Sequence, residues 1–221
     1  MVNMIKHEKN INRKTAALIL AAGEGSRMGG RAKCLIKIDR EPLILGQLRT
    51  LRAAGIEQIT IVTGFYREQI EAVLEAALAQ DTALHLIRNP APELGQQGSV
   101  DLGLKHLQAD PELVLIALAD QPLIDAKDIG ELLDAFEARP LHTEILYPVV
   151  GGQRGNPVLM SGACVRNFLT EHSHLTCRQF IDQQASSVYR YLTSNDHFIT
   201  DLDTEEDLAA VRKKTGLDIT L

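Results

Sequence analysis

Short apolar runs alternate with helical patterns through the first two thirds of the chain. Four runs are almost continuously apolar and rich in β-branched side chains, which predicts strands buried on both faces, at residues 16–22, 58–63, 83–88 and 113–119. Apolar residues at helical spacing predict the intervening helices, at residues 42–54, 67–80, 99–107 and 126–139. This alternation predicts an α/β fold, a three-layer α/β/α domain with a mostly parallel sheet.

The order of elements changes after Pro140. Strand patterns occur at residues 144–150, 157–160, 188–192 and 197–202, and helical patterns at 162–170 and 176–184. We therefore expect a mixed sheet in the second half of one domain, residues 15–221. Residues 1–14 are polar and of mixed charge, which predicts a flexible N-terminal tail without the apolar core of a signal peptide.

Composition restricts the classes of function. The 221 residues are 45% hydrophobic and carry a net charge of −6, enough for one sizeable core and unfavourable for a nucleic-acid partner. No apolar run approaches the roughly 20 residues of a membrane helix. The three cysteines, Cys34, Cys164 and Cys177, are too scattered for a disulfide framework or a close-spaced zinc site, so a cytoplasmic location is expected.

A glycine-rich segment with two cations follows the first predicted strand. Gly23, Gly25 and Gly29 allow positive φ angles and bring backbone N–H groups against phosphate oxygens. Arg27 can bind phosphate in a bidentate fork, and Lys33 supplies a mobile point charge. The segment predicts a triphosphate-binding loop, with these residues at the nucleotide: Leu20, Ala21, Ala22, Gly23, Gly25, Ser26, Arg27 and Lys33.

Two better-known phosphate loops fit this spacing poorly. A P-loop needs Ser or Thr after Gly-Lys, whereas Lys33 lies between Ala32 and Cys34. The dinucleotide fingerprint needs a third glycine three residues after the second, and here the interval from Gly25 to Gly29 is four, so a nicotinamide-dependent oxidoreductase is disfavoured. An ordinary strand–helix turn remains the structural alternative.

The combined motifs resemble those of nucleotidyltransferases of the molybdenum cofactor cytidylyltransferase type, within the glycosyltransferase-A-like (nucleotide-diphospho-sugar transferase) family. The resemblance covers nearly the whole chain. It rests on the glycine-rich loop, Asn89-Pro90 with Gly95 to Gly103, Leu118 to Pro122, Gly155-Asn156-Pro157 and Asp201 to Asp207. It implies nucleotidyl transfer with Arg27, Lys33 and Asp120 as catalytic residues, and Asn89, Gly98 and Ser99 near the base and ribose. For 99–107, an amphipathic core helix is the alternative.

A divalent cation, Mg²⁺, is expected because attack at an α-phosphate must overcome clustered negative charge. Asp120 follows a predicted strand and precedes Gln121-Pro122, which orients its carboxylate; a simple strand-end turn is the alternative. Asp203, at a late position that matches a metal ligand of the resembled family, is expected as the second ligand, with Asp201 as substitute. The same string predicts a helix N-cap at Thr204 with Asp207, and both interpretations can hold.

The resemblance also implies the substrates. Leu-Ala-Ala-Gly at residues 20–23 is similar to the cytidylyl-transferring branch, so CTP is preferred to GTP. The implied acceptor is the phosphate of a molybdenum-bearing molybdopterin, with Gly155, Asn156, Pro157 and Arg178 on the acceptor side. Asn156 stands where the family has His, and its amide can still donate a hydrogen bond.

Three alternatives stay open. The first is a nucleotidyltransferase that uses GTP or another NTP and acts on another phosphorylated acceptor. The second is a non-catalytic molybdopterin-binding chaperone that serves a target molybdoenzyme, and the third is a nicotinamide-dependent oxidoreductase. Covalent catalysis by Cys34 is not expected, because no His–Asn partner pattern accompanies it and a cysteine without such a partner is more often a small buried residue.

Overall fold

The strand β1 (Thr15–Ala21) lies at the centre of the main sheet and is buried over nearly its whole length. It pairs in parallel with β4 (Gln58–Thr63) on one side and β6 (Leu113–Leu118) on the other. The registers bring Ala21 opposite Thr63 and Leu20 opposite Leu118, so the three strands end together. The segments that follow them therefore meet at one edge of the sheet.

This computed structural model describes residues 14–108, 110–172 and 175–221. The main sheet has the order β10-β7-β9-β6-β1-β4-β5, with β8 paired to β7. β9 runs antiparallel to β6 and β7, whereas β10 is parallel to β7. The remaining strands of this sheet are β5 (Leu84–Arg88), β7 (Ile145–Val150), β8 (Gln153–Arg154), β9 (Val158–Ser161) and β10 (Val188–Thr193).

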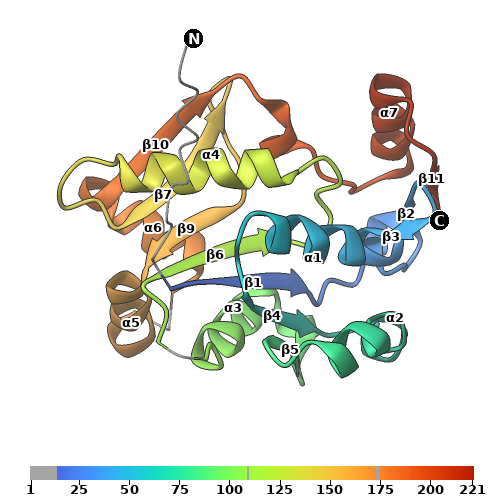
Figure 1. The fold of residues 1–221 in the computed structure, drawn as a ribbon, viewed down its shortest axis with the longest axis horizontal. Coiled ribbons are helices and arrows are strands. Elements are labelled where there is room, and N and C mark those ends of the chain that lie inside the picture. Colours follow the sequence, from blue (N-terminus) through green and yellow to red (C-terminus); the bar gives the residue numbers. More distant parts are fainter. Residues whose placement is uncertain (1–13, 109, 173–174) are drawn as a thin grey trace, which may run out of the picture.

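Alternate residues of the central strands face two separate cores, which makes the fold three-layered (Figure 1). Ile19 and its alternate neighbours pack against α1 (Leu43–Ala53), α2 (Arg67–Gln80) and α4 (Ala126–Glu137). Leu18 and Leu20 face the opposite core. That core is covered by α3 (Gln96–Lys105), α5 (Gly162–Glu171) and α6 (Cys177–Gln183).

A smaller lobe covers the end of the molecule toward which β1 points (Figure 1). Its three-stranded sheet consists of β2 (Lys37–Ile38), β3 (Glu41–Pro42) and β11 (Ile219–Thr220), and α7 (Glu205–Thr215) packs beside it. Met28, Leu202 and Leu208 belong to the buried cluster of this lobe. The lobe thus joins the glycine-rich loop to the C-terminal segment.

The structure confirms the predicted α/β fold and the mixed second half, with most boundaries shifted by one to three residues. The helix predicted at 99–107 begins three residues earlier, at Gln96. Residues 1–13 of the predicted tail lie outside the described part. Lys14, its last residue, is tied to the sheet because its carbonyl accepts hydrogen bonds from the N–H groups of Glu112 and Leu113.

The strand predicted over residues 197–202 is wrong. The chain forms a 3-10 turn at Asp196–Ile199 and then continues without regular structure to Asp203. The Asn195 side chain accepts a hydrogen bond from the N–H of His197, and Gln121 donates one to the carbonyl of Phe198. Side chains, together with backbone groups of Asp120 and Asn156, therefore satisfy backbone groups that a strand would pair in a ladder.

Among the described residues, no helix has both the length and the apolar character needed to cross a membrane.

Gly103 gives a test of the packing between α3 and the sheet. A Cβ atom at this position would lie 2.3 Å from Leu18 Cδ1 and 2.9 Å from Val62 Cγ2. Gly103→Ala should therefore destabilise the fold by about 1–3 kcal/mol through overpacking. In thermal unfolding, the melting temperature Tm should fall by roughly 2–4 °C for each kcal/mol of lost stability.

The matched control is Gly130→Ala in α4, where an added Cβ meets nothing within 4 Å. This change should leave stability unchanged or raise it by up to about 1 kcal/mol, because alanine is the better helix former. Equal effects of the two substitutions would contradict the close approach of α3.

Candidate functional site

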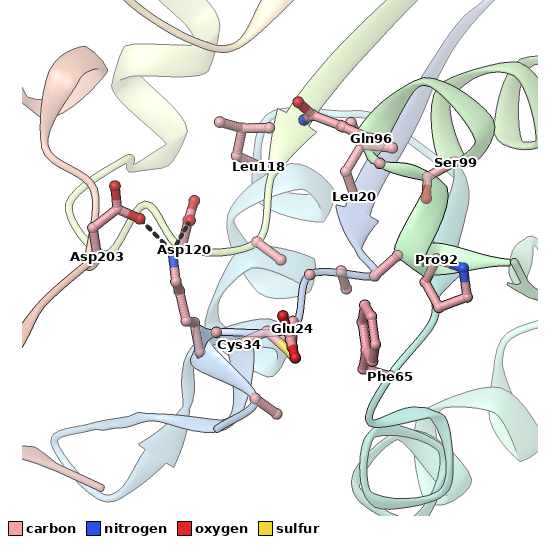
Figure 2. Close-up of a pocket in the computed structure, with 18 of the residues that line it drawn as sticks. Leu20, Glu24, Cys34, Phe65, Pro92, Gln96, Ser99, Leu118, Asp120 and Asp203 are labelled. Atoms are coloured by element: carbon pink, nitrogen blue, oxygen red, sulfur yellow. Dashed lines mark hydrogen bonds and ion pairs between the residues drawn. The ribbon is translucent and has the colours of Figure 1, made fainter. Parts of the chain in front are cut away.

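A cavity of about 630 Å³ opens at the edge where the central strands end. Its walls come from the end of β1 and the glycine-rich loop, from the end of β6, from the turns after β4 and β5, from the start of α3, and from the C-terminal segment that precedes α7. Figure 2 shows Asp120 and Asp203 at one end of this cavity and Phe65, Pro92 and Ser99 at the other. Asp120, Asp203 and Lys33 make one end of the cavity charged, whereas Phe65, Pro92 and Ser99 lie at the other end, and the carboxylates of Glu24 and Glu93 also line the cavity.

The glycine-rich loop follows β1 directly. Gly25 and Gly29 have φ angles of 62° and 70°, as predicted, whereas Gly23 does not have a positive φ. A Cβ on Gly25 would lie 2.0 Å from the carbonyl oxygen of Arg31, so only glycine fits there. Gly23 lines the cavity, and a Cβ there would meet nothing within 4 Å, so neither its φ angle nor its packing in this structure requires glycine.

The charged end of the cavity is a cluster of one ammonium group and two carboxylates. Lys33 Nζ lies 3.0 Å from Asp120 Oδ2 and also donates a hydrogen bond to Asp203 Oδ1 (dashed lines in Figure 2). Arg27 Nη1 lies 3.5 Å from Asp203 Oδ2, and its side chain is 75% exposed. Two cations and two anions from four separate segments thus meet at this point.

Lys33 is a cation in this arrangement. Partial burial by itself lowers the pKa of its ammonium group, but hydrogen bonds to Asp203 and Asp120, and the charges of both, outweigh burial and raise the pKa above its ordinary value. A lysine with a raised pKa stays protonated at neutral pH. It can neutralise negative charge and cannot act there as a general base.

Asp203 is held by contacts on both sides of it. The N–H of Leu202 donates a hydrogen bond of 2.9 Å to the carbonyl of Asp120, and the Leu202 side chain is fully buried. The next residue, Thr204, is the N-cap of α7 and forms the predicted capping box with Asp207. Capping and a position at the cavity therefore occur together, because Thr204 caps the helix while Asp203 lines the cavity.

The donor atoms at this end fit a divalent cation of the magnesium type. Oδ1 of Asp120 and Oδ1 of Asp201 are buried and have no hydrogen-bond partner among the described residues. Burial and the charge of Asp120 raise the pKa of Asp201 to about 6. The described part of the chain has no group of three or more His, Cys, Asp or Glu residues arranged around a metal position. Two carboxylates suffice for Mg²⁺, which keeps waters and binds substrate phosphates.

Most residues predicted at the nucleotide line this one cavity. They are Leu20, Ala21, Ala22, Gly23, Gly25, Lys33 and Ser99, together with the predicted metal ligands Asp120 and Asp203. Ser26, Arg27, Asn89 and Gly98 are not among the described residues that line it. Arg27 still reaches the charged end through Asp203.

Asn89 contributes to the structure next to the cavity. Its side chain is buried, donates a hydrogen bond of 2.9 Å to Ser99 Oγ, and accepts one of 3.0 Å from the N–H of Ala91. Gly98 lies against this amide, since a Cβ there would be 3.5 Å from Asn89 Nδ2. Asn89 thereby fixes the start of α3, which brings Ser99 and Gln96 to the cavity wall.

The four residues predicted at the acceptor are outside the described lining of the cavity. Gly155 is buried against Phe198, where a Cβ would lie 2.5 Å from the carbonyl oxygen. The N–H of Asn156 donates to the same carbonyl at 2.9 Å, and Pro157 is buried next to it. Arg178 is exposed on α6. Their role toward an acceptor stays a prediction.

Sequence reasoning missed several wall residues, chiefly Phe65, Pro92, Glu93 and Gln96. Phe65 lies two residues after β4, and Pro92 and Glu93 lie in the loop after β5. The rule that ligands bind beyond the carboxyl ends of parallel strands could have found them, because β4 and β5 were both predicted.

The sequence matches the family described as the MobA-like NTP transferase domain over residues 17–188, well over half of the chain. The chain belongs to this family. The matched region includes the glycine-rich loop, Lys33 and Asp120, and it ends before Asp203.

Curated relatives of the chain include bifunctional GlmU proteins. The GlmU protein of Sorangium cellulosum is 30% identical over 123 residues, which are 55% of this chain and 26% of that protein. The GlmU protein of Trichlorobacter lovleyi is 28% identical over 206 residues, which are 85% of this chain and 44% of that protein. The chain thus spans less than half the length of these two relatives.

Solved structures show the same fold. A nucleotidyl transferase from Methanothermobacter thermautotroptrophicus aligns with a TM-score of 0.73 at 18% identity, over 91% of this chain and 97% of that one. Rv0371c of Mycobacterium tuberculosis, solved as a complex with manganese, has a TM-score of 0.66 at 19% identity over 91% and 98%. CMP:2-keto-3-deoxy-manno-octonic acid synthetase, complexed with CTP, has a TM-score of 0.68 at 14% identity over 92% and 98%.

The cysteines give a test of the chemistry of the cavity. Burial raises the pKa of Cys34 to about 12, of Cys164 to about 12 and of Cys177 to about 11. Because the thiolate is the reactive form, the native protein should hardly react with iodoacetamide at pH 8, and all three thiols should react after unfolding. Peptide mass spectrometry measures each site, and fast native labelling of Cys34 would contradict its burial.

Proposed function

We propose that the chain is a nucleotidyltransferase that uses a nucleoside triphosphate, preferably CTP, and transfers the nucleotidyl group to a phosphate of a molybdopterin-type acceptor. The observation that carries this proposal is the position of Lys33 between Asp120 and Asp203, beside a glycine-rich loop at the carboxyl edge of a parallel sheet. Family membership supports the same class of reaction.

The two ends of the cavity support an orientation for the triphosphate. Backbone N–H groups of the glycine-rich loop and the cations Lys33 and Arg27 favour the phosphates at the charged end. The opposite end, with Phe65, Pro92 and Ser99, offers apolar surface and one hydroxyl to the base and ribose. A nucleotide in this orientation would present its α-phosphate near Asp120.

The reaction needs no proton transfer if the acceptor is a phosphate monoester. An anionic oxygen of the acceptor attacks the α-phosphorus, a new P–O bond forms, and the bond to the bridging oxygen of the β-phosphate breaks. Pyrophosphate leaves toward the glycine-rich loop. Lys33 and Arg27 neutralise the charge that accumulates on it, because positioning and electrostatics supply most of the catalysis in such transfers.

Asp120 and Asp203 would hold Mg²⁺, which when bound supplies positive charge at the triphosphate. The free oxygen Oδ1 of Asp120 supports this role. Lys33 has a flexible stem, so its ammonium group can exchange a carboxylate for phosphate oxygens when substrate enters. The manganese complex of Rv0371c supports a divalent ion in a protein of this fold.

The preference for CTP rests on the Leu-Ala-Ala-Gly sequence at residues 20–23, and the CTP complex of a protein with the same fold supports it. The molybdopterin acceptor rests on the resemblance of the motifs in the second half of the chain. Arg178, together with Asn156, remains the proposed contact to the acceptor.

Release of pyrophosphate tests the proposal. The protein is incubated with molybdenum-bearing molybdopterin, Mg²⁺ and each of CTP, GTP, UTP and ATP, and pyrophosphate is measured with a coupled enzyme assay. We expect release with CTP to exceed that with the other three by at least about tenfold, a difference of roughly 1.4 kcal/mol in transition-state binding. Pyrophosphate release with GTP and not with CTP would support the same nucleotidyl transfer but with a guanylyl product. Nucleotide binding without pyrophosphate from any triphosphate would favour a chaperone that delivers the cofactor to a molybdoenzyme.

Asp120→Asn tests the metal role with little change in shape. The amide cannot supply the anionic oxygen, so we expect kcat for pyrophosphate release to fall by at least about 100-fold. The Mg²⁺ concentration for half-maximal activity should rise. Glu75→Gln, an equivalent change on the exposed side of α2, should leave both quantities unchanged. An Asp120→Asn variant that keeps its Mg²⁺ dependence and its rate would exclude Asp120 as a ligand.

A further inference from the structure

Phe65 is a large apolar side chain that is exposed inside the cavity. It is 42% exposed and forms part of the wall opposite the charged end (Figure 2). The other large hydrophobic residues with high exposure, Leu94, Leu141, Leu192 and Leu221, are not among the described residues of this wall. An aromatic face left open in a pocket is a candidate contact for a ligand.

The backbone on the N-terminal side of Phe65 is fixed by close packing. A Cβ on Gly64 would lie 2.7 Å from the carbonyl oxygen of Ala22, 2.7 Å from Pro92 Cβ and 2.9 Å from Ala22 Cβ. Only glycine allows the turns after β1, β4 and β5 to approach this closely. Gly64 thus brings Phe65 next to both the glycine-rich loop and Pro92.

The backbone on the C-terminal side of Phe65 is fixed by a hydrogen bond. The hydroxyl of Tyr66 donates a hydrogen bond of 2.7 Å to the carbonyl of Glu24 in the glycine-rich loop. The N–H of Arg67, at the start of α2, donates to the carbonyl of Gly64 at 3.4 Å. Phe65 therefore projects from a turn held at both ends, and its ring costs little conformational entropy when a ligand binds against it.

The ring lies at the end of the cavity away from Asp120 and Asp203, and the carboxylates of Glu24 and Glu93 also line the cavity. In Figure 2 Phe65 and Pro92 are on the side of Ser99, and Asp120 and Asp203 are on the other side of the Leu20 side chain. If the phosphates of a nucleotide bind at Lys33 and the glycine-rich loop, the planar, uncharged base at the other end of the molecule extends toward Phe65.

We propose that Phe65, with Pro92 beside it, forms the surface on which the base of the nucleoside triphosphate rests. This inference rests on the proposed function and adds a contact to the nucleotide that the sequence did not indicate. Every base has a π-face, so an aromatic ring contributes affinity to all four nucleotides and does not choose among them. Phe65 accordingly governs how tightly a nucleotide binds, and other residues govern which nucleotide is preferred.

The test compares a ligand that has a base with one that has none. Binding of CTP and of inorganic triphosphate, each with Mg²⁺, is measured by calorimetry on the full chain. Phe65→Ala should weaken the binding of CTP about tenfold and should leave the affinity for inorganic triphosphate within about twofold of the wild-type value. The affinities for GTP, UTP and ATP should fall by similar factors. In turnover, KM for CTP should rise about tenfold with kcat nearly unchanged, because the contact is the same in the ground and transition states.

Variants at the same position separate stacking from folding. Phe65→Trp and Phe65→Tyr should keep CTP affinity within about twofold, and Phe65→Leu should fall between wild type and Phe65→Ala. Leu141→Ala removes an exposed apolar side chain outside the cavity wall and should change the affinity for neither ligand. If Phe65→Ala does not fold, Phe65→Leu replaces it in the comparison of CTP with inorganic triphosphate, and thermal unfolding shows whether that variant is folded.

Three results would overturn the inference. If Phe65→Ala binds CTP as tightly as the wild type, and the wild-type protein turns over CTP, the base contact is refuted and the proposed function still holds. Equal losses for CTP and inorganic triphosphate would show that Phe65 only supports the glycine-rich loop. Wild-type protein that binds none of the nucleotides more tightly than inorganic triphosphate would defeat the base site together with the proposed nucleotide substrate.

Discussion

The ammonium group of Lys33 lies between two carboxylates, Asp120 and Asp203, that are 87 and 170 residues away along the chain. The rest of the site depends on this contact, because two anions at the edge of a sheet repel each other unless a cation lies between them. Lys33 follows the glycine-rich loop, Asp120 follows β6, and Asp203 precedes α7. The contact therefore joins the main sheet and the small lobe at the charged end of the cavity.

The backbone supports this contact without relying on charge. The N–H of Leu202 bonds to the carbonyl of Asp120, and Gln121 donates a hydrogen bond to the carbonyl of Phe198. Met28 and Leu202 share the buried cluster of the small lobe, so the glycine-rich loop and the C-terminal segment are held by apolar packing as well. A site held in this way keeps its shape when a ligand replaces the ion pairs, which is the condition for preorganised binding.

The sequence was sufficient to predict the strand–helix alternation, the glycine-rich loop and the position of Asp120, because these are local patterns. The capping box at Thr204 was also local. The small sheet was missed because β2, β3 and β11 have two residues each, too few for a periodic signal, and β11 comes from the far end of the chain. The strand predicted at 197–202 was wrong because its backbone groups bond to the side chains of Asn195 and Gln121 and to the backbone of Asp120 and Asn156, not to a neighbouring strand. Phe65 was missed because its exposure depends on how three turns pack around Gly64.

The position of a divalent ion in a complex with nucleotide tests the central claim most directly. Crystals grown with Mn²⁺ and a non-hydrolysable CTP analogue would locate the ion by its anomalous scattering. We predict one peak coordinated by carboxylate oxygens of Asp120 and Asp203, with the ammonium group of Lys33 moved onto the phosphates. An ion bound elsewhere, or Lys33 still between the two carboxylates with the nucleotide in place, would contradict the assignment of this cluster as the centre of nucleotidyl transfer.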